Sequence, residues 1–295
     1  MNILRLCAPS KTFLLGEYAV LTSGQSLLLA TDPGFELQVS LTQLSSKALF
    51  LQQIGQADNS PAAVLWGDVC PEVKRVCSPG KGFGSSSAFA WFALLYSYYH
   101  KHLCLPSLKG DFFARSFERI KGSTDGVGSG ADIACQYYAG VTITDLESSS
   151  ASRYRWPFSE VDFVIVQTGV CFSTPKHIAG FSMDTRRLQL LTKQGIAAFE
   201  QADLDVFLQV VRDYQAVLSE HGLLIDNSSR MLATLKGMPG YLAAKACGAM
   251  GAETIVVLFE RACRSDARTF LAQQGITVHS YLEQLSMGLS MDLLH

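Results

Sequence analysis

Apolar residues recur along the chain with the spacings of both strands and helices. From Leu37 to Leu41 apolar and polar residues alternate, which predicts a half-buried strand. The short apolar runs within 162–167 and 254–259 predict strands buried on both faces. Further strands are expected at 3–8, at 13–21 and, as an edge strand, at 276–279. Pro9, Ser10 and Lys11 predict a turn between the first two of these.

The apolar run from residue 88 to 103 follows a glycine-rich loop and predicts a long helix. Helices are also expected at 112–120, 131–138, 199–219, 228–236 and 266–274. Because strands and helices alternate in both halves, we expect two layers of α/β or α+β type. The serine-rich stretch 147–152 is the best candidate for a linker between the halves.

Composition places the chain among folded proteins without a general affinity for polyanions. Hydrophobic residues make up 48% and charged residues 17%, which excludes a disordered chain. The 24 basic and 26 acidic residues give a net charge of −2, so we expect neither nucleic acid nor a membrane as partner. At about 150 residues per domain, a chain of 295 residues predicts two domains.

The eight cysteines predict neither a zinc site nor a disulfide framework. They are dispersed, with no CxxC pair, and on apolar segments such residues behave as small buried hydrophobes. The sequence before Cys7 lacks an apolar stretch of signal-peptide length, and the run from Phe89 to Tyr99 is too short to span a bilayer. We therefore expect a cytoplasmic protein with reduced thiols.

A glycine loop, residues 79–87 (PGKGFGSSS), precedes the long helix. At a helix start, free backbone N–H groups and the positive end of the helix dipole converge, and glycines let a phosphate approach the backbone. Lys81 adds a cation, and the serine hydroxyls are candidates for phosphate or magnesium. A plain turn with Ser85 as helix N-cap fits the same residues equally well. No Walker A string occurs.

Three further segments contain residues for which both a functional and a purely structural interpretation are open. Lys11 is either a cation that meets an anion or an exposed lysine beside a strand. Asp132, where a Gly/Ser loop enters an apolar segment, is either a group that orients or deprotonates a hydroxyl or a helix cap, and Asp125 competes for the same role. The small residues of 245–254 permit close packing of the backbone against a ligand or against another element.

Taken in order, these segments resemble the motifs of the GHMP kinase family, named for its galactokinase, homoserine kinase, mevalonate kinase and phosphomevalonate kinase members. Residues 8–21 (APSKTFLLGEYAVL) resemble the first motif, and 79–88 (PGKGFGSSSA) the second. Residues 128–132 (GSGAD) match the segment with the family's catalytic aspartate, and 248–253 (GAMGAE) take the place of its third, glycine-rich motif. The order and spacing cover nearly the whole chain.

The resemblance implies an α+β protein with the two-domain GHMP kinase fold. An N-terminal α/β domain with the phosphate loop would span residues 1–152, and a C-terminal ferredoxin-like α+β domain residues 153–295. The active site would lie between them.

The resemblance also implies ATP and Mg²⁺ as cofactors and transfer of the γ-phosphoryl group to a small molecule. Lys11 and Asp132 would be catalytic: Lys11 stabilises charge on the transferred group, and Asp132 orients or deprotonates the acceptor. The residues expected to bind ATP are Pro79, Lys81, Gly82, Gly84, Ser85, Ser86 and Ser87, with the Ser86 hydroxyl on Mg²⁺. The residues expected to bind the acceptor are Glu17, Tyr18, Ser129, Gly130, Ser173 and Thr174.

Within the family, residues 16–20 and 128–134 are most similar to phosphomevalonate kinases, since mevalonate kinases usually have His where Tyr18 stands. This implies 5-phosphomevalonate as the acceptor, in a monomer or homodimer. Lys81, Lys176 and either Arg186 or Arg187 are candidates for a second phosphate site.

The chain departs from the family pattern at several positions. Ser10 replaces a glycine, Phe83 replaces leucine, and Met250 and Ala252 replace glycines of the third motif. Two alternatives therefore stay open: a kinase for mevalonate or another small alcohol, and a nucleotide-binding protein without catalysis.

Overall fold

The chain folds around two antiparallel sheets. The computed structural model describes residues 2–22, 24–68, 70–80, 82–108, 111–123, 129–145, 147–148, 150–170 and 184–294. Over these residues the first sheet has six strands in the order β10-β1-β2-β4-β5, with β3 also paired to β2. Its strands are β1 (Ile3–Leu15), β2 (Gln25–Ser45), β3 (Cys70–Cys77), β4 (Val141–Asp145), β5 (Ser150–Tyr154) and β10 (Ser290–Leu294).

The second sheet is built entirely from the later part of the chain. Over the described residues it has four strands in the order β7-β8-β6-β9. They are β6 (Val161–Gln167), β7 (Tyr241–Cys247), β8 (Thr254–Glu260) and β9 (Val278–Tyr281). With helices between β6 and β7 and between β8 and β9, this is the β-α-β-β-α-β order of a ferredoxin-like unit. The expected edge strand, β9, pairs with β6 alone.

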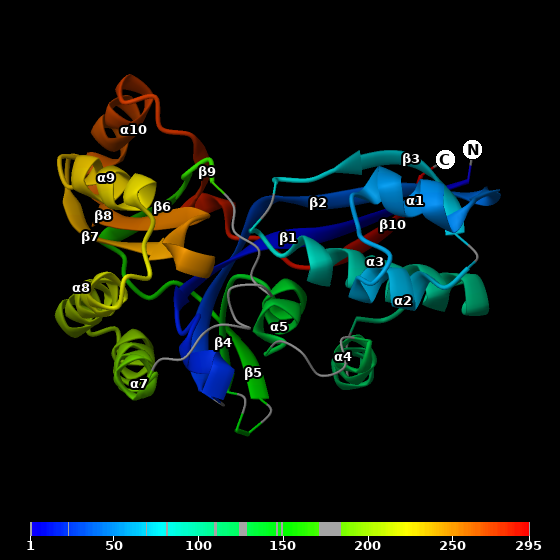
Figure 1. Ribbon diagram of the computed structural model, residues 1–295, viewed down its shortest axis with the longest axis horizontal. Helices are drawn as coiled ribbons and strands as arrows, with labels where there is room; N and C mark the ends of the chain where they lie inside the picture. The colour runs from blue at the N-terminus through cyan, green and yellow to red at the C-terminus, as the bar shows by residue number, and fades with distance from the viewer. Residues whose placement is uncertain are drawn as a thin grey trace.

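Helices cover both sheets. In the first half they are α1 (Lys47–Ile54), α2 (Pro61–Trp66), α3 (Ser85–His102), α4 (Phe112–Gly122) and α5 (Ala131–Tyr138). In the second half they are α7 (Arg186–Glu200), α8 (Leu204–Glu220), α9 (Asp226–Leu235) and α10 (Arg264–Gln273). Short 3-10 helices lie at Ala19–Thr22, Ala249–Gly251, Arg261–Cys263 and Leu282–Gln284. Figure 1 shows α2, α3, α4 and α5 along one side of the long strands β1 and β2.

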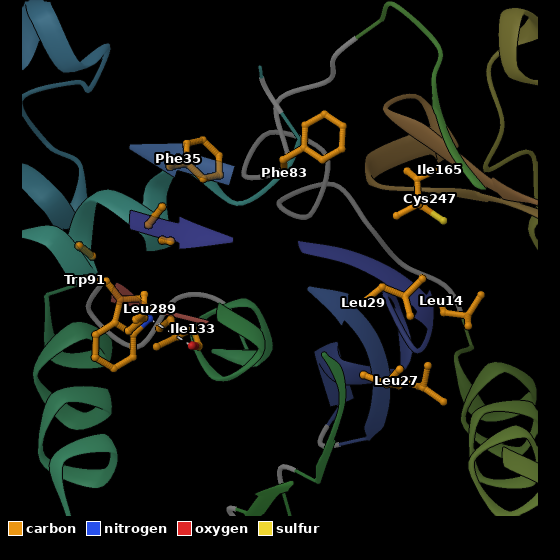
Figure 2. Close-up of a cluster of buried hydrophobic side chains, with 14 of the residues drawn as sticks. Leu14, Leu27, Leu29, Phe35, Phe83, Trp91, Ile133, Ile165, Cys247 and Leu289 are labelled. Atoms are coloured by element: carbon orange, nitrogen blue, oxygen red, sulfur yellow. Dashed lines mark hydrogen bonds between the residues drawn. The ribbon is translucent and has the colours of Figure 1, made fainter. Parts of the chain in front are cut away.

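One hydrophobic core joins the two sheets. In β6, Phe163 and Ile165 point into the large cluster that contains Leu14, Leu29 and Phe83 of the first half. The alternate residue Val164 packs into a second cluster with α9 and α10. Successive side chains of β6 thus point into different apolar clusters. Because both faces of the strand are buried, its sequence is an unbroken apolar run. Figure 2 shows Trp91 of α3, whose indole N–H donates to the carbonyl of Ile133 in α5 at 3.1 Å, in the same core.

Three local expectations were wrong. Residues 3–15 form one strand, because the register with β2 shifts between Ala8 and Ser10 instead of breaking at a turn. Such a bulge accommodates a proline without loss of a ladder hydrogen bond. Residues 147–152 are no linker: they connect β4 to β5 and begin β5, which pair as an antiparallel hairpin. The helix expected over 199–219 is two helices, α7 and α8, separated at Gln201–Asp203.

The domain boundary expected between residues 152 and 153 falls inside β5. At the other end of the chain, β10 returns to the first sheet and pairs with β1. Figure 1 accordingly shows both chain ends on the side of the first sheet. The division into 1–152 and 153–295 stays a prediction.

Candidate active site

Strand β1 brings Lys11 directly against the glycine loop. The backbone N–H of Lys11 donates to the carbonyl of Phe83 at 2.9 Å. The Lys11 side chain lies over Gly84, where an added Cβ would be 2.9 Å from its Cγ. Only glycine leaves room for the lysine at this position. Lys11 and Gly84, which are far apart in the sequence and were both expected at the active site, are therefore in contact.

The glycine loop ends in an open helix N-terminus. Gly82 and Gly84 both have φ of +91°, a left-handed conformation that glycine adopts without strain. Helix α3 begins at Ser85 with Gly84 as N-cap, and no side chain caps it. The alternative with Ser85 as N-cap is thus wrong. Because the first-turn N–H groups have no partner within the helix, this end offers donors and positive potential to an anion.

The three serines at the start of α3 differ in their surroundings. Ser86 is exposed and Ser85 half-buried. Ser87 is buried, and its hydroxyl donates to the carbonyl of Gly84 at 2.9 Å. Ser87 therefore holds the loop together, whereas the Ser86 hydroxyl faces outward at the helix end.

Asp132 lies in the first turn of α5. Gly130, with φ of +81°, is the N-cap, and an added Cβ there would lie 2.7 Å from the Phe117 ring of α4. The Ser129 hydroxyl accepts from the N–H of Ala131 at 3.2 Å. Asp132 is half-buried, and its Oδ1 accepts from the N–H of Ile133 at 3.0 Å. The carboxylate is thus oriented by its own helix.

Lys11 and Asp132 both act on the thiol of Cys135, one turn further along α5. Burial raises the pKa of the Cys135 thiol to about 12, while the Lys11 charge lowers it and the Asp132 charge raises it further. The charges of the two expected catalytic residues therefore both influence this buried thiol.

Gln136, which sequence reasoning missed, ties the site together. It is completely buried, and its Nε2 donates to the carbonyls of Pro9 at 3.1 Å and Gly84 at 3.0 Å. One amide of α5 thus holds both β1, just before Lys11, and the glycine loop. The available signal was a lone amide within the apolar stretch 131–138.

Glu17 and Tyr18, expected to contact the acceptor, are buried and face the second sheet. Glu17 forms an ion pair with Lys245 of β7, and the two side chains are 6% and 0% exposed. The Tyr18 hydroxyl accepts from the N–H of Met250 at 3.1 Å. Burial, together with the Glu17 charge, raises the pKa of Tyr18, so this hydroxyl stays protonated.

The environment of the Glu17–Lys245 pair sets its charge state. Burial lowers the pKa of Lys245, but the adjacent Cys247 and Glu17 outweigh it and raise that pKa overall. The Lys245 ammonium also donates to the carbonyl of Ala246 at 2.9 Å and lies 5.2 Å from the centre of the Tyr214 ring. The raised pKa favours the charged form of Lys245 despite its complete burial. The sequence signal was a lysine inside an apolar strand, YLAAKAC.

The 248–253 segment differs from a glycine-rich loop at two points. Met250 has φ of +58°, a conformation that costs a non-glycine residue free energy. It is held there by Tyr18 and by the N–H of Ile225, which donates to the Met250 carbonyl at 3.2 Å. The Glu253 side chain lies on Gly82 of the glycine loop, where an added Cβ would be 2.7 Å from the Glu253 Cδ.

Some expected residues have no structural description. Lys81, Ser173, Thr174 and Lys176 lie outside the described residues, as does Asp125. Pro79 and the loop up to Gly80 are described, and Arg186 and Arg187 pair with Asp184 and Glu220 on the surface.

The described part of the chain contains neither a cluster of metal-ligating side chains nor a membrane-spanning helix. No group of three or more His, Cys, Asp or Glu residues in it is placed to hold a metal ion. None of its helices is long and apolar enough to cross a membrane.

The fold is similar to solved kinase structures over nearly the full chain. Mevalonate kinase from L. major in complex with R-mevalonate is 16% identical, covers 93% of this chain and 94% of its own, and has a TM-score of 0.68. Streptococcus pneumoniae phosphomevalonate kinase in complex with phosphomevalonate and AMPPNP is 13% identical, covers 95% and 99%, and has a TM-score of 0.69. Lactococcus lactis galactokinase complexed with galactose is 13% identical, covers 98% and 95%, and has a TM-score of 0.71.

At these identities the likeness establishes the fold alone. No protein-family model and no curated protein sequence matches the chain. The expected α+β architecture is confirmed, with two antiparallel sheets and full-length similarity to GHMP-type kinases. The chain therefore has the fold of the GHMP kinases.

Proposed function

We propose that this chain is an ATP-dependent kinase for a small molecule, and that its acceptor is 5-phosphomevalonate. The observation that carries the proposal is the contact of Lys11 with Gly84 at the open N-terminus of α3. A lysine, glycines with room for a phosphate and free helix N–H groups form an anion site suited to a polyphosphate.

The described residues fit the phosphate end of Mg·ATP. Gly82 and Gly84 supply a loop without side chains, and the first-turn N–H groups of α3 supply donors. The exposed Ser86 hydroxyl is an oxygen ligand of the kind that Mg²⁺ prefers. When bound, ATP supplies the γ-phosphoryl group and Mg²⁺ neutralises charge on the phosphates.

Lys11 and Asp132 take the remaining roles. The Lys11 side chain lies against the loop, and its ammonium stabilises negative charge on the transferred group. Asp132 orients the acceptor or takes its proton. If the acceptor is already a phosphate, whose second pKa is about 6, little base strength is needed, and Asp132 serves mainly to position Lys11.

The acceptor is proposed from the motifs and from the fold. Residues 16–20 and 128–134 are most similar to phosphomevalonate kinases, and one similar structure is a phosphomevalonate kinase with that ligand. Gly130 and Ser129 lie two and three residues before Asp132, and we propose that they border the acceptor. Because Glu17 and Tyr18 are buried, we propose that they hold the 248–253 segment and β7 in place beside it.

The test is release of ADP from ATP in the presence of Mg²⁺, with 5-phosphomevalonate and mevalonate assayed in parallel by a coupled assay. Turnover with the phosphorylated acceptor alone is the expected result. Turnover with mevalonate alone would assign a mevalonate kinase and show that Tyr18 is no marker of the acceptor. ATP binding without turnover would point to another acceptor or to lost catalysis. Failure to bind ATP would overturn the proposal.

A further inference from the structure

The Lys11 ammonium lies over the ring of Phe13, which is two residues further along β1. Successive side chains of a strand alternate between its two faces, so residues two apart point to the same face. The Lys11 Nζ is 5.1 Å from the centroid of the Phe13 ring. The face of an aromatic ring has a negative potential and attracts a cation at this distance. Lys11 and Phe13 therefore form a cation–π pair.

The Phe13 ring is itself fixed by packing. It is half-buried, and its partner in the ladder with β2 is Leu28. Both residues belong to a small apolar cluster to which helix α5 contributes Ala131 and Cys135. The ring thus lies between the first sheet and α5. Because it is held there by its neighbours, it provides a fixed surface for the longer and more flexible lysine side chain.

The backbone around Lys11 is fixed as well. Ser10, where the family pattern has a glycine, is completely buried, and its hydroxyl donates to the carbonyl of Pro33 at 2.7 Å. The N–H of Lys11 itself is bonded to the carbonyl of Phe83 in the glycine loop. The place of the ammonium is therefore decided by the rotation of the lysine side chain and by its contact with the Phe13 ring.

The carboxylates nearest to Lys11 in the expected active site have other partners. Glu17 forms its ion pair with Lys245. The Oδ1 of Asp132 accepts from the backbone N–H of Ile133. Within the part of the chain that the structure describes, no carboxylate forms an ion pair with the Lys11 ammonium. The group that holds this ammonium among the described residues is therefore an aromatic ring.

We propose that Phe13 is a positioning residue of the kinase reaction: the face of its ring holds the Lys11 ammonium at the glycine loop and leaves the positive charge free for a phosphate group. A carboxylate would hold the ammonium too, but it would neutralise the charge that the phosphate has to meet. A ring attracts the cation without a charge of its own. The inference rests on the proposed function, because it takes the transferred phosphoryl group as the anion that Lys11 stabilises.

The same contact allows two other roles. The ring could keep the ammonium away from the phosphates, or it could simply fill space between β1 and α5. The three roles differ in how activity depends on the electron density of the ring. Weakening the attraction lowers the activity if the ring positions Lys11 and raises it if the ring withholds Lys11. If the ring only fills space, the activity does not follow the electron density.

The first experiment varies this electron density in the full chain. The phenylalanine at position 13 is replaced by phenylalanines with one, three and five fluorine atoms, which withdraw electrons from the ring and largely keep its shape. The measured quantity is kcat/KM for ATP with the acceptor proposed above. We expect it to fall stepwise, by about tenfold over the series.

Phe270 of α10 provides the matched control. It is also half-buried against an apolar cluster, and among the described residues no cation lies over its ring. The same fluorinated series at Phe270 should leave kcat/KM unchanged.

The second experiment observes the contact without a nucleotide. In the free protein with isotopically labelled lysine ε-carbons, the ring current of Phe13 should shift the ε-methylene proton signal of Lys11 upfield of those of the exposed lysines. Lys11→Arg assigns the signal, because the signal disappears in this variant. Phe13→Leu, which removes the ring and stays apolar, should return the signal to the range of the exposed lysines.

The two experiments together decide between the roles. A Lys11 signal without the upfield shift would overturn the inference, whatever the activities are. A shifted signal with a kcat/KM that rises with fluorination, or does not follow it, would also overturn the inference and leave the proposed function standing. If wild type binds no ATP, the proposed function fails, and the positioning role fails with it even where the signal is shifted.

Discussion

Phe83 of the glycine loop stacks on His279 of strand β9, with ring centroids 3.9 Å apart and planes inclined by 24°. Figure 2 shows Phe83 at the loop, between the strand that contains Phe35 and the second-sheet strands that contain Ile165 and Cys247. Phe83 is one of the chain's departures from the family pattern, and its ring has a specific partner. The stack and the Glu253 contact join the loop to the second sheet at two adjacent residues.

The first prediction concerns acid stability. Burial lowers the pKa of His279 from an ordinary 6.5 to about 4. The unfolded chain therefore takes up a proton on this residue below pH 6.5, whereas the folded chain does so only near pH 4. The contribution of His279 to the free energy of unfolding is therefore fully present above pH 6.5. About 3 kcal/mol of it is lost as the pH falls toward 4.

The variant His279→Phe isolates this contribution. Within the described residues His279 Nε2 is buried without a hydrogen-bond partner, so phenylalanine loses no bond and keeps the stack. Urea unfolding at pH 7 and pH 4.5 should show a smaller loss of stability for His279→Phe than for wild type. Parallel losses in the two proteins would mean that the pKa of His279 is the same in the folded and the unfolded chain.

The second prediction separates backbone strain from contact in the glycine loop. Gly80 and Gly84 both have positive φ, but an added Cβ meets nothing within 4 Å at Gly80 and meets Lys11 and Gln136 at Gly84. Gly80→Ala should cost about 1 kcal/mol of stability from strain alone. Gly84→Ala should cost about 2 to 3 kcal/mol, because the lysine and the amide must move as well.

Nucleotide affinity distinguishes the two variants further. Only Gly84→Ala displaces Lys11, so only this variant should bind the ATP analogue about tenfold more weakly, a difference of about 1.4 kcal/mol. Chemical denaturation and calorimetric titration measure the two effects. Equal affinities in the two variants would show that the contact of Lys11 with Gly84 has no part in nucleotide binding.

The third prediction concerns the buried pair Glu17–Lys245. Lys245→Met leaves the Glu17 carboxylate buried without its cation and should cost about 3 to 5 kcal/mol of stability. The double variant Glu17→Leu/Lys245→Met removes both charges and should be more stable than Lys245→Met. Urea unfolding of the four proteins in this cycle measures the coupling.

An exposed pair provides the control for this cycle. Arg187 and Glu220 are 57% and 53% exposed, so Arg187→Met should cost less than about 1 kcal/mol. A similar cost for Lys245→Met would contradict the view that Lys245 is a buried cation paired with Glu17.

Elements with a local signal could be predicted from the sequence, and contacts between distant segments could not. The apolar run after the glycine loop is α3, and the runs in 162–167 and 254–259 are β6 and β8, because burial on both faces leaves an unbroken pattern. The turn expected at Pro9 failed because a bulge in a paired strand carries the same residues as a turn.

The candidate site divides in the same way. Lys11 and Asp132 could be proposed from the motifs, whereas their shared electrostatic effect on Cys135 depends on how β1 and α5 pack. Gln136, Glu253 and His279 form their contacts with residues more than fifty positions away. No local sequence pattern specifies such a distant partner. The sequence indicated these three residues only as polar side chains in an apolar context.

The fourth prediction concerns Asp132. Asp132→Asn keeps an oxygen that can accept from the N–H of Ile133, so helix α5 should form normally and the ATP analogue should bind as in wild type. The substitution removes the charge that acts on Cys135, and with it the group proposed to orient or deprotonate the acceptor. We expect kcat to fall by about 100-fold or more while the KM for ATP changes little.

Asp266→Asn, an exposed acid in the first turn of α10, is the matched control and should leave kcat unchanged. Steady-state kinetics with the acceptor proposed above decide the question, since nearly normal turnover of Asp132→Asn would exclude the proposed catalytic role of Asp132.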